Sequence, residues 1–376
     1  MCQNTEVVET DDNDTNQSSP STTNLKNINE SNNALGPTSE INIFGRHSKH
    51  CYKWSLSDFE LHTKPLSSNF YSQVFRGRYK NDSSRQVAIK VWDKYQLSKP
   101  QNVGYRNAVM QERRILSKLT HNKFVISLHM SFVDEHNLYM VMDLFIGKHI
   151  GRDPTAAPYY AAEILSALEW LHFHHGIVHG DLKPSNILVR QNSIKLIDFG
   201  AAIISSKDTI ASSNVVMGTA DYIAPEVLTG KSDSNDMSYI CARDLWSFGC
   251  IIYFMYVGAS PFHAETDYLA MENILSLNPS TLLLQSIIPL KAQHVIQSLL
   301  TRYPVTSRLG AMDHEQMKMS KIKQYKSLRE LPYFSNTTDK VLLHSDHHQQ
   351  LHQQNIYSDS GPIVDGAKCG FDFFAV

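Results

Sequence analysis

The chain has 376 residues, 42% of them hydrophobic and 19% charged, with a formal net charge of −2 at pH 7 and a pI near 6.8. This is the composition of an ordinary soluble protein, and it excludes collagen-like, wholly disordered and disulfide-scaffold chains. Because the charge is nearly balanced, we expect no nucleic-acid partner and no membrane-binding domain in this chain.

Two polar tails flank the part of the sequence that has a globular texture. Nineteen of the first 40 residues are Asn, Ser or Thr, and seven acidic residues there outnumber a single basic one. Such a segment cannot bury enough apolar surface to offset the entropy lost on ordering. We therefore expect residues 1–50 to be a disordered Asn/Ser/Thr-rich tail. After Phe334 the sequence becomes polar again, so residues 335–376 are expected to form a polar C-terminal tail.

The cysteines and the N-terminus bear on the cellular compartment. The chain has five cysteines, an odd number, and no C-x-x-C pair, which is typical of a reducing compartment. The acidic N-terminus lacks the apolar segment of a secretory signal. The sequence therefore predicts a cytoplasmic or nuclear protein.

The globular part begins with strands and continues with helices. Residues 87–91 alternate and predict a strand with Val87, Ile89 and Val91 on one face. Short apolar strands follow at 125–128 and 138–142, and from Pro158 onward the pattern is mostly helical. Between them, residues 107–119 predict a helix with a buried stripe made of Ala108, Glu112, Ile115, Leu116 and Leu119.

Two charged residues stand where apolar residues are expected. Lys90 lies inside the hydrophobic strand, and Glu112 lies on the buried stripe of the helix. An unpaired buried charge is costly, and each residue supplies the charge that the other lacks. We therefore predict an ion pair between Lys90 and Glu112. The alternative is that each occupies a rim position and reaches solvent.

A polar loop between apolar segments holds residues suited to catalysis. Asp181, Lys183 and Asn186 lie in the segment H-G-D-L-K-P-S-N, and Asp198 opens a D-F-G triplet twelve residues after Asn186. Carboxylate and amide oxygens are the ligands that Mg²⁺ prefers, so Asn186 and Asp198 are candidate metal ligands. The Asp181 carboxylate can accept a proton from an incoming hydroxyl, and Lys183 can reach the same phosphate.

These motifs, in this order, resemble those of protein kinases. The chain resembles a eukaryotic protein kinase across about residues 58–334, and D-L-K-P-x-N is similar to the Ser/Thr rather than the Tyr branch. Residues 162–172, 218–220 and 249–253 are similar to the phosphoinositide-dependent protein kinases of the AGC group. Phosphoinositide-dependent kinases usually carry a C-terminal PH domain, and this chain ends too soon for one. Further matching motifs are Ala224-Pro225-Glu226, Asp244-Leu245-Trp246 and Arg308-Leu309-Gly310.

The resemblance implies both a fold and an activity. The fold is α+β with two lobes, a small antiparallel β-sheet lobe with helix αC and a larger, mainly α-helical lobe. The activity is Mg-ATP-dependent transfer of the γ-phosphate to Ser/Thr hydroxyls of protein substrates, with ATP and Mg²⁺ as cofactors. The alternative is a pseudokinase scaffold with weak or no turnover.

The resemblance also implies roles for individual residues. Lys90 holds the α- and β-phosphates and pairs with Glu112, Asp181 orients or deprotonates the substrate hydroxyl, and Lys183 steadies the γ-phosphate. Glu226 pairs with Arg308, and Asp244 braces the catalytic loop. The adenine and hinge contacts are Val74, Ala88, Met142, Asp143, Phe145 and Leu188, although core packing is the alternative for Val74, Ala88 and Leu188. The phosphate loop is formed by Ser67, Ser68, Asn69, Phe70, Tyr71 and Ser72.

The sequence departs from the kinase pattern at three places. Ser67, Asn69 and Ser72 replace the glycines of the phosphate loop, and glycine is the residue that permits positive φ and close approach to phosphate. Gly180 replaces the catalytic-loop Arg, and Val215 aligns with the phosphate acceptor that this Arg would hold. Residues 148–158 are too short for helix αD and its ribose-binding acid. The altered phosphate loop and the missing ribose-binding acid favour the pseudokinase alternative. The intact Lys90, Glu112, Asp181, Lys183, Asn186 and Asp198 favour the enzyme.

The last residues contain an F-x-x-F pattern, Phe371 to Phe374. It is similar to the hydrophobic motif that AGC kinases place beside helix αC, and phosphoinositide-dependent kinases take this motif from their substrates. Partner kinases with an F-x-x-F motif are therefore expected. Lys94, Leu97 and Arg113 align near the pocket that receives it. The alternative is a frayed C-terminus whose phenylalanines have no role.

Overall fold

The computed structural model describes residues 53–119, 122–191, 193–204, 220–230, 237–282, 287–311, 313 and 324–335. The expected tail at residues 1–50, the segment with Val215, and the F-x-x-F pattern lie outside the described residues. Every structural statement below refers to the described residues.

The first lobe is built on an antiparallel sheet of six strands. These are β1 (Phe59–Leu61), β2 (Ser67–Ser68), β3 (Ser72–Tyr79), β4 (Gln86–Asp93), β5 (Leu128–Val133) and β6 (Asn137–Asp143). Their order is β1-β3-β4-β6-β5, and the short β2 pairs with β3.

Strand β4 shows why this sequence forms the centre of the sheet. Val87 and Ile89 are fully buried in a cluster on one face, with Val91 packed against it, as the alternation predicted. The other face carries Ala88 and Lys90. Because successive side chains of a strand point to opposite faces, one strand contributes to the core and to the site at the same time.

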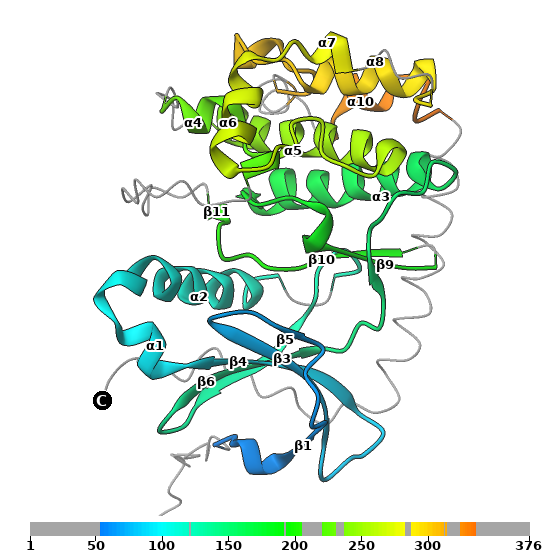
Figure 1. Ribbon diagram of the computed structural model, residues 1–376. Helices are drawn as coiled ribbons and strands as arrows, with labels where there is room; N and C mark the ends of the chain where they lie inside the picture. Colours follow the sequence, from blue (N-terminus) through cyan, green and yellow to red (C-terminus); the bar gives the residue numbers. More distant parts are fainter. Residues whose placement is uncertain are drawn as a thin grey trace, which may run out of the picture. The chain divides into compact units, whose positions relative to one another are not determined.

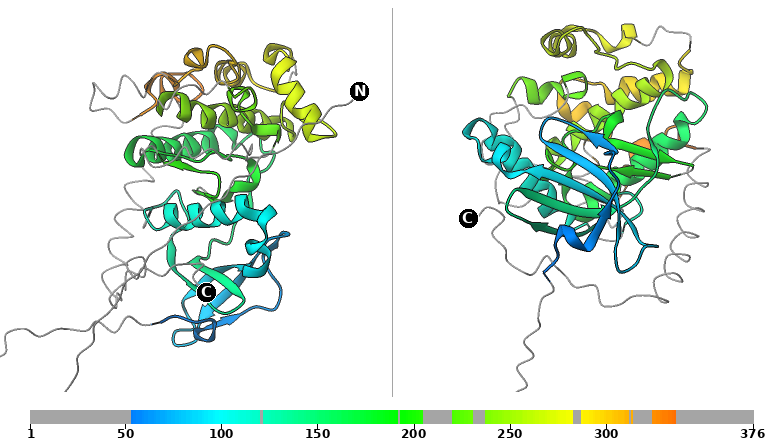
Figure 2. Two further views of the ribbon diagram at one scale, coloured as in Figure 1. Left: turned by 90° about the vertical axis from the view of Figure 1, so that its left-hand side faces the viewer. Right: turned by 60° about the horizontal axis from the view of Figure 1, so that its bottom comes forward.

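Three helical segments follow β4: α1 (Lys94–Ser98), the 3₁₀ turn η2 (Pro100–Asn102) and α2 (Val103–Leu116). Helix α2 runs along one face of the sheet (Figures 1 and 2). The prediction of a helix at 107–119 was wrong at both ends. The first turn, with exposed Val103 and Tyr105, carries no apolar stripe, and the buried Leu119 belongs to the turn after the helix.

The second lobe is mainly helical. Its long helices are α3 (Ala157–Glu169) and α5 (Met237–Val257), and α3 continues into the π-helical η3 (Trp170–His175). Smaller elements complete it: η5 (Ala220–Tyr222), α4 (Pro225–Leu228), α6 (Asp267–Ser276), α7 (Pro279–Leu282), α8 (Leu290–Leu299), η6 (Val305–Ser307) and α10 (Lys326–Arg329). Residues 150–156 form no helix, as expected from the shortened stretch.

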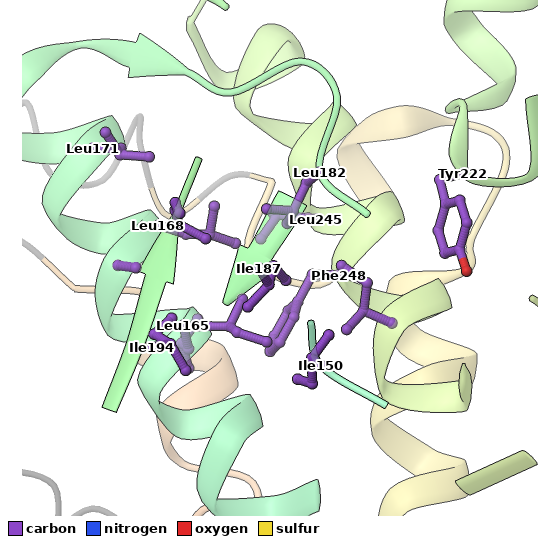
Figure 3. Close-up of a cluster of buried hydrophobic side chains, with 14 of the residues drawn as sticks. Ile150, Leu165, Leu168, Leu171, Leu182, Ile187, Ile194, Tyr222, Leu245 and Phe248 are labelled. Atoms are coloured by element: carbon purple, nitrogen blue, oxygen red, sulfur yellow. The ribbon is translucent and has the colours of Figure 1, made fainter. Parts of the chain in front are cut away.

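The core of this lobe lies between α3, α5 and a group of short strands. Leu165 and Leu168 of α3 meet Leu245 and Phe248 of α5, and all four are fully buried (Figure 3). Among the described helices, α5 is long and apolar enough by composition to cross a membrane. However, 83% of its most apolar 18-residue stretch is buried inside the protein. Its apolar character therefore belongs to the core.

The short strands carry the polar loops of the site. Strands β7 (Lys148–His149), β9 (Ile187–Arg190) and β10 (Ser193–Leu196) form one antiparallel sheet, and β8 (Ile177–Val178) pairs with β11 (Ile203–Ile204). The 3₁₀ turn η4 (Pro184–Asn186) precedes β9. Ile187 and Ile194 anchor this sheet in the core (Figure 3), so the loops at its ends start from fixed positions.

Candidate active site

The predicted ion pair between strand β4 and helix α2 is confirmed. Lys90 Nζ donates to both carboxylate oxygens of Glu112, at 2.9 and 2.8 Å. The side chains are 14% and 5% exposed, so neither residue occupies the rim position that was the alternative. The pair joins the centre of the sheet to the helix.

A second carboxylate, that of Asp198, acts on this lysine. Burial alone would lower the pKa of Lys90, but the charges of Glu112 and Asp198 outweigh it and raise that pKa. For Asp198 the directions are reversed: burial alone would raise its pKa, but the positive charges of Lys90 and His179 outweigh burial and lower that pKa. Asp198 is therefore ionised at neutral pH and suited to a hard cation.

Asp198 is held by an unusual backbone conformation. Its φ is +65°, a left-handed value that is uncommon for a non-glycine residue and that occurs most often in Asn and Asp. The next residue, Phe199, is fully buried and its ring lies 4.9 Å from that of His179. Gln111 of α2 donates to Ala202 O at 3.0 Å, so the segment after Asp198 is tied to the helix that carries Glu112.

The loop from 181 to 186 brings three of the predicted residues together. Lys183 Nζ lies 2.7 Å from Asp181 Oδ2. Asn186 Nδ2 donates to the backbone oxygen of Asp181 at 2.8 Å and to its Oδ2 at 3.2 Å. Since the amide nitrogen of Asn186 faces Asp181, its Oδ1 is the atom left to bind a cation, as its predicted role as a metal ligand requires.

A buried network from α5 braces this loop. Asp244 accepts the backbone N–H of His179 at 2.7 Å and that of Gly180 at 3.0 Å, in line with its predicted bracing role. His172 donates Nε2–H to Asp244 at 2.9 Å and shares a hydrogen bond through Nδ1 with the hydroxyl of Tyr325. Burial alone would lower the pKa of His172, but Cys241 and Asp244 raise it to about 10.

The residues predicted to surround adenine lie along β3, β4, β6 and β9. Ala88 pairs with Met142 in register, and both are 8% exposed. Val74 pairs with Lys90, and it is half-buried, as is Leu188. This arrangement is compatible with adenine contact and with core packing, so the predicted role stays a prediction.

The hinge residues have firm contacts of their own. His129 Nε2 donates to Asp143 Oδ1 at 2.7 Å. Burial would raise the pKa of Asp143, but the hydrogen bond and charge of His129 lower it to about 2. Phe145 packs against the large buried cluster that includes residues of both lobes, and its backbone oxygen accepts the Gly147 N–H at 3.1 Å.

The phosphate loop forms a closed hairpin without glycine. Ser67 and Ser68 pair with Val74 and Gln73, and both serines are exposed. The side-chain oxygen of Asn69 accepts the N–H groups of Tyr71 at 2.9 Å and Ser72 at 2.7 Å. Phe70 at the tip is 79% exposed. An asparagine side chain therefore organises the turn that glycines form in the family pattern.

Residues 67–320 match the family described as the protein kinase domain. The chain belongs to the protein kinase family. It is 35% identical over 301 residues to the human 3-phosphoinositide-dependent protein kinase 1, an alignment that covers 77% of this chain and 48% of that one. It is 37% identical over 246 residues to the serine/threonine-protein kinase ksg1 of Schizosaccharomyces pombe, covering 59% of this chain and 39% of that one.

A third relative, the serine/threonine-protein kinase PKH1 of Saccharomyces cerevisiae, is 34% identical over 255 residues, which cover 62% of this chain and 32% of that one. The kinase described here thus spans half or less of the length of these three curated relatives. All three are named as protein kinases, which supports the Ser/Thr kinase class, the AGC-type resemblance and the two-lobed fold. Nothing in the comparisons favours the pseudokinase alternative.

Local packing explains why position 180 is a glycine in this kinase. Its φ is +77°, and a Cβ built on it would collide with the backbone oxygen of Ala201. A side chain at this position would therefore require the segment after Asp198 to move. The glycine in place of the catalytic-loop Arg is therefore compatible with the local packing. Val215, the aligned acceptor position, lies outside the described residues.

The predicted pair between Glu226 and Arg308 is confirmed. Arg308 donates from Nη1 and Nη2 to the two carboxylate oxygens at 2.8 and 2.9 Å. The side chains are 2% and 0% exposed. The pair ties helix α4 to the segment that follows α8.

Sequence reasoning missed two contributors to the site. His172 and Tyr325 complete the network behind the catalytic loop, and they come from segments 153 residues apart. A histidine on a buried helical face was the available signal for His172. Nothing in the local sequence distinguishes Tyr325 from an ordinary core tyrosine.

Proposed function

We propose that this kinase transfers the γ-phosphate of ATP, with Mg²⁺, to Ser or Thr hydroxyls of protein substrates. The observation that carries the proposal is that the charges of Lys90, Glu112, Lys183 and Asp198 act on one another although they come from four separate segments. Lys183 in turn contacts Asp181. The Lys90–Glu112 pair and the lowered pKa of Asp198 give the charges that phosphate and metal require. A scaffold without turnover would have no need for that arrangement.

Each residue has a proposed part in the reaction. Lys90 binds the α- and β-phosphates, and Glu112 keeps its ammonium in position. Asp181 orients the incoming hydroxyl and accepts its proton, while Lys183, 2.7 Å from Asp181, neutralises charge on the transferred phosphoryl group.

The donor set fits Mg²⁺, because Asp198 offers an ionised carboxylate and Asn186 a neutral amide oxygen. When bound, the metal would offset the negative charge of the phosphates. Asp198 and Asn186 would hold it. The proposed nucleotide wall consists of Val74, Ala88, Met142, Asp143, Phe145 and Leu188.

The proposed partners are suggested by the family resemblance and by the surface of the first lobe near α1 and α2. We propose that kinases with an F-x-x-F motif are among the protein substrates, and that the motif binds near α1 and α2. In the structure Leu97 is fully buried, and Arg113 donates Nε–H to Ser131 Oγ at 2.9 Å. Leu97 therefore supports the floor of such a site, whereas Lys94 and Arg113 offer charge at its edge.

The test is phosphoamino-acid analysis after incubation of the purified chain with Mg²⁺, labelled ATP and a peptide library that contains Ser, Thr and Tyr acceptors. We expect label on Ser and Thr. An unlabelled library, or label confined to Tyr, would contradict the proposal. The Asp181→Asn variant is the control for a contaminating kinase.

A further inference from the structure

Two stacked tyrosines join the phosphate loop to helix α2. The ring centroids of Tyr71 and Tyr105 lie 3.7 Å apart, with an interplanar angle of 29°. The Tyr71 hydroxyl donates to Asn102 Oδ1 at 3.3 Å. Asn102 is 5% exposed and donates Nδ2–H to Gln96 O at 2.8 Å. Because that bond fixes the orientation of the amide, the oxygen that receives Tyr71 is set in advance.

The loop tip is arranged so that Tyr71 faces the helix. The Asn69 side chain holds the N–H groups of Tyr71 and Ser72, and the Ser72 backbone oxygen accepts the Asn69 N–H at 2.9 Å. Ser72 is 7% exposed. A glycine at position 69 would supply none of the side-chain bonds, so the direction of the Tyr71 ring depends on this departure from the family pattern.

Tyr105 and Glu112 belong to the same helix. They are seven residues apart, which places them two turns apart on the same face, about 10 Å along the axis. Glu112 binds Lys90 of β4, and Lys90 pairs in register with Val74 of β3, the strand that leaves the loop. Loop, helix, ion pair and the two strands therefore form a closed ring of contacts.

We propose that Tyr71 and Tyr105 form a latch that couples the phosphate loop to helix α2, so that the loop and the Lys90–Glu112 pair take up their nucleotide-binding positions together. Both tyrosines are positioning residues, because they act through the loop and the helix. The proposal rests on the proposed function, since ATP is the ligand that the loop would cover.

The first experiment is a double-mutant cycle with steady-state kinetics. An aromatic pair contributes roughly 0.5–1.5 kcal/mol, so Tyr71→Ala and Tyr105→Ala should each raise the KM for ATP by about 2- to 12-fold. The double variant should be no worse than the worse single variant, because the second change removes a contact already lost. Tyr105→Phe keeps the stack and should leave the KM at the wild-type value, whereas Tyr71→Phe keeps the stack but loses the bond to Asn102 and should raise the KM less than Tyr71→Ala. Tyr95→Ala, an exposed tyrosine on α1, is the matched control.

The second experiment measures amide hydrogen exchange in the nucleotide-free protein. Tyr71 lies in the loop, so a latch predicts that Tyr71→Ala speeds amide exchange in the first two turns of α2. The control variant Tyr95→Ala should leave that exchange unchanged. Multiplicative KM effects in the double variant, or unchanged α2 exchange in Tyr71→Ala, would overturn the latch. If the wild-type chain transfers no phosphate, the proposed function fails, and the exchange experiment still decides on the latch.

Discussion

The Glu226–Arg308 pair is a buried contact whose loss should be large and measurable. Glu226→Gln keeps the shape of the side chain and removes its charge, which leaves the fully buried Arg308 without a counter-charge. Breaking one partner of a buried pair costs about 3–5 kcal/mol. Arg308 also donates Nε–H to Thr301 O at 3.1 Å and lies 5.2 Å from the Trp246 ring, so it cannot easily turn towards solvent.

At about 2–4 °C of Tm per kcal/mol for a domain of this size, the expected loss is about 6–20 °C. Differential scanning calorimetry measures it, with urea unfolding as a second method. The matched control is Glu330→Gln, which removes the Lys326–Glu330 pair, where the side chains are 68% and 66% exposed. That control should shift Tm by no more than about 2 °C. Equal shifts in the two variants would refute the reasoning that burial sets the cost.

Three further predictions concern other parts of the molecule. Asn69→Asp keeps both bonds to the loop amides but adds a negative charge, so the KM for ATP should rise while Tm holds; an unchanged KM would mean that phosphates do not approach the tip. The pKa of His172 is raised to about 10, so its contribution to stability is complete below about pH 6.5 and is lost as the pH rises towards 10. Urea unfolding at pH 6, 8 and 10 should therefore show a steeper decline in wild type than in His172→Gln, and parallel profiles would count against it. Truncation after Lys368 should lower basal activity and strengthen binding of an F-x-x-F peptide, measured by calorimetry; no change in either would leave the tail without a role.

The site residues that could be predicted from the sequence are charged residues that stand in otherwise apolar patterns. Lys90 in an apolar strand and Glu112 on an apolar helical stripe are both costly alone, which is why their pairing could be predicted. The resemblance supplied Glu226–Arg308 and the roles in the catalytic loop. Periodicity also located β4 and the helical second lobe, because burial imposes a pattern on each of them.

Other parts gave no such signal. The first turn of α2 carries exposed residues such as Tyr105, so periodicity began the helix too late. The stack of Tyr71 on Tyr105 and the bond between His172 and Tyr325 join residues that are unremarkable in their own segments. Such contacts depend on how distant segments pack, and local pattern does not encode that packing. In the sequence Asn69 is only a missing glycine, whereas in the structure its side-chain oxygen accepts two backbone N–H groups.

Asp181→Asn is the variant that decides whether this kinase transfers phosphate with Asp181 acting on the substrate hydroxyl. Turnover and ATP affinity should be measured side by side on the purified variant and wild type. Because a positioned base contributes about 10²- to 10⁴-fold, kcat should fall by that factor while the Kd for Mg-ATP stays within about twofold. Turnover equal to wild type would contradict the proposed role of Asp181, and a wild-type chain that binds Mg-ATP and transfers no phosphate would contradict the proposed reaction.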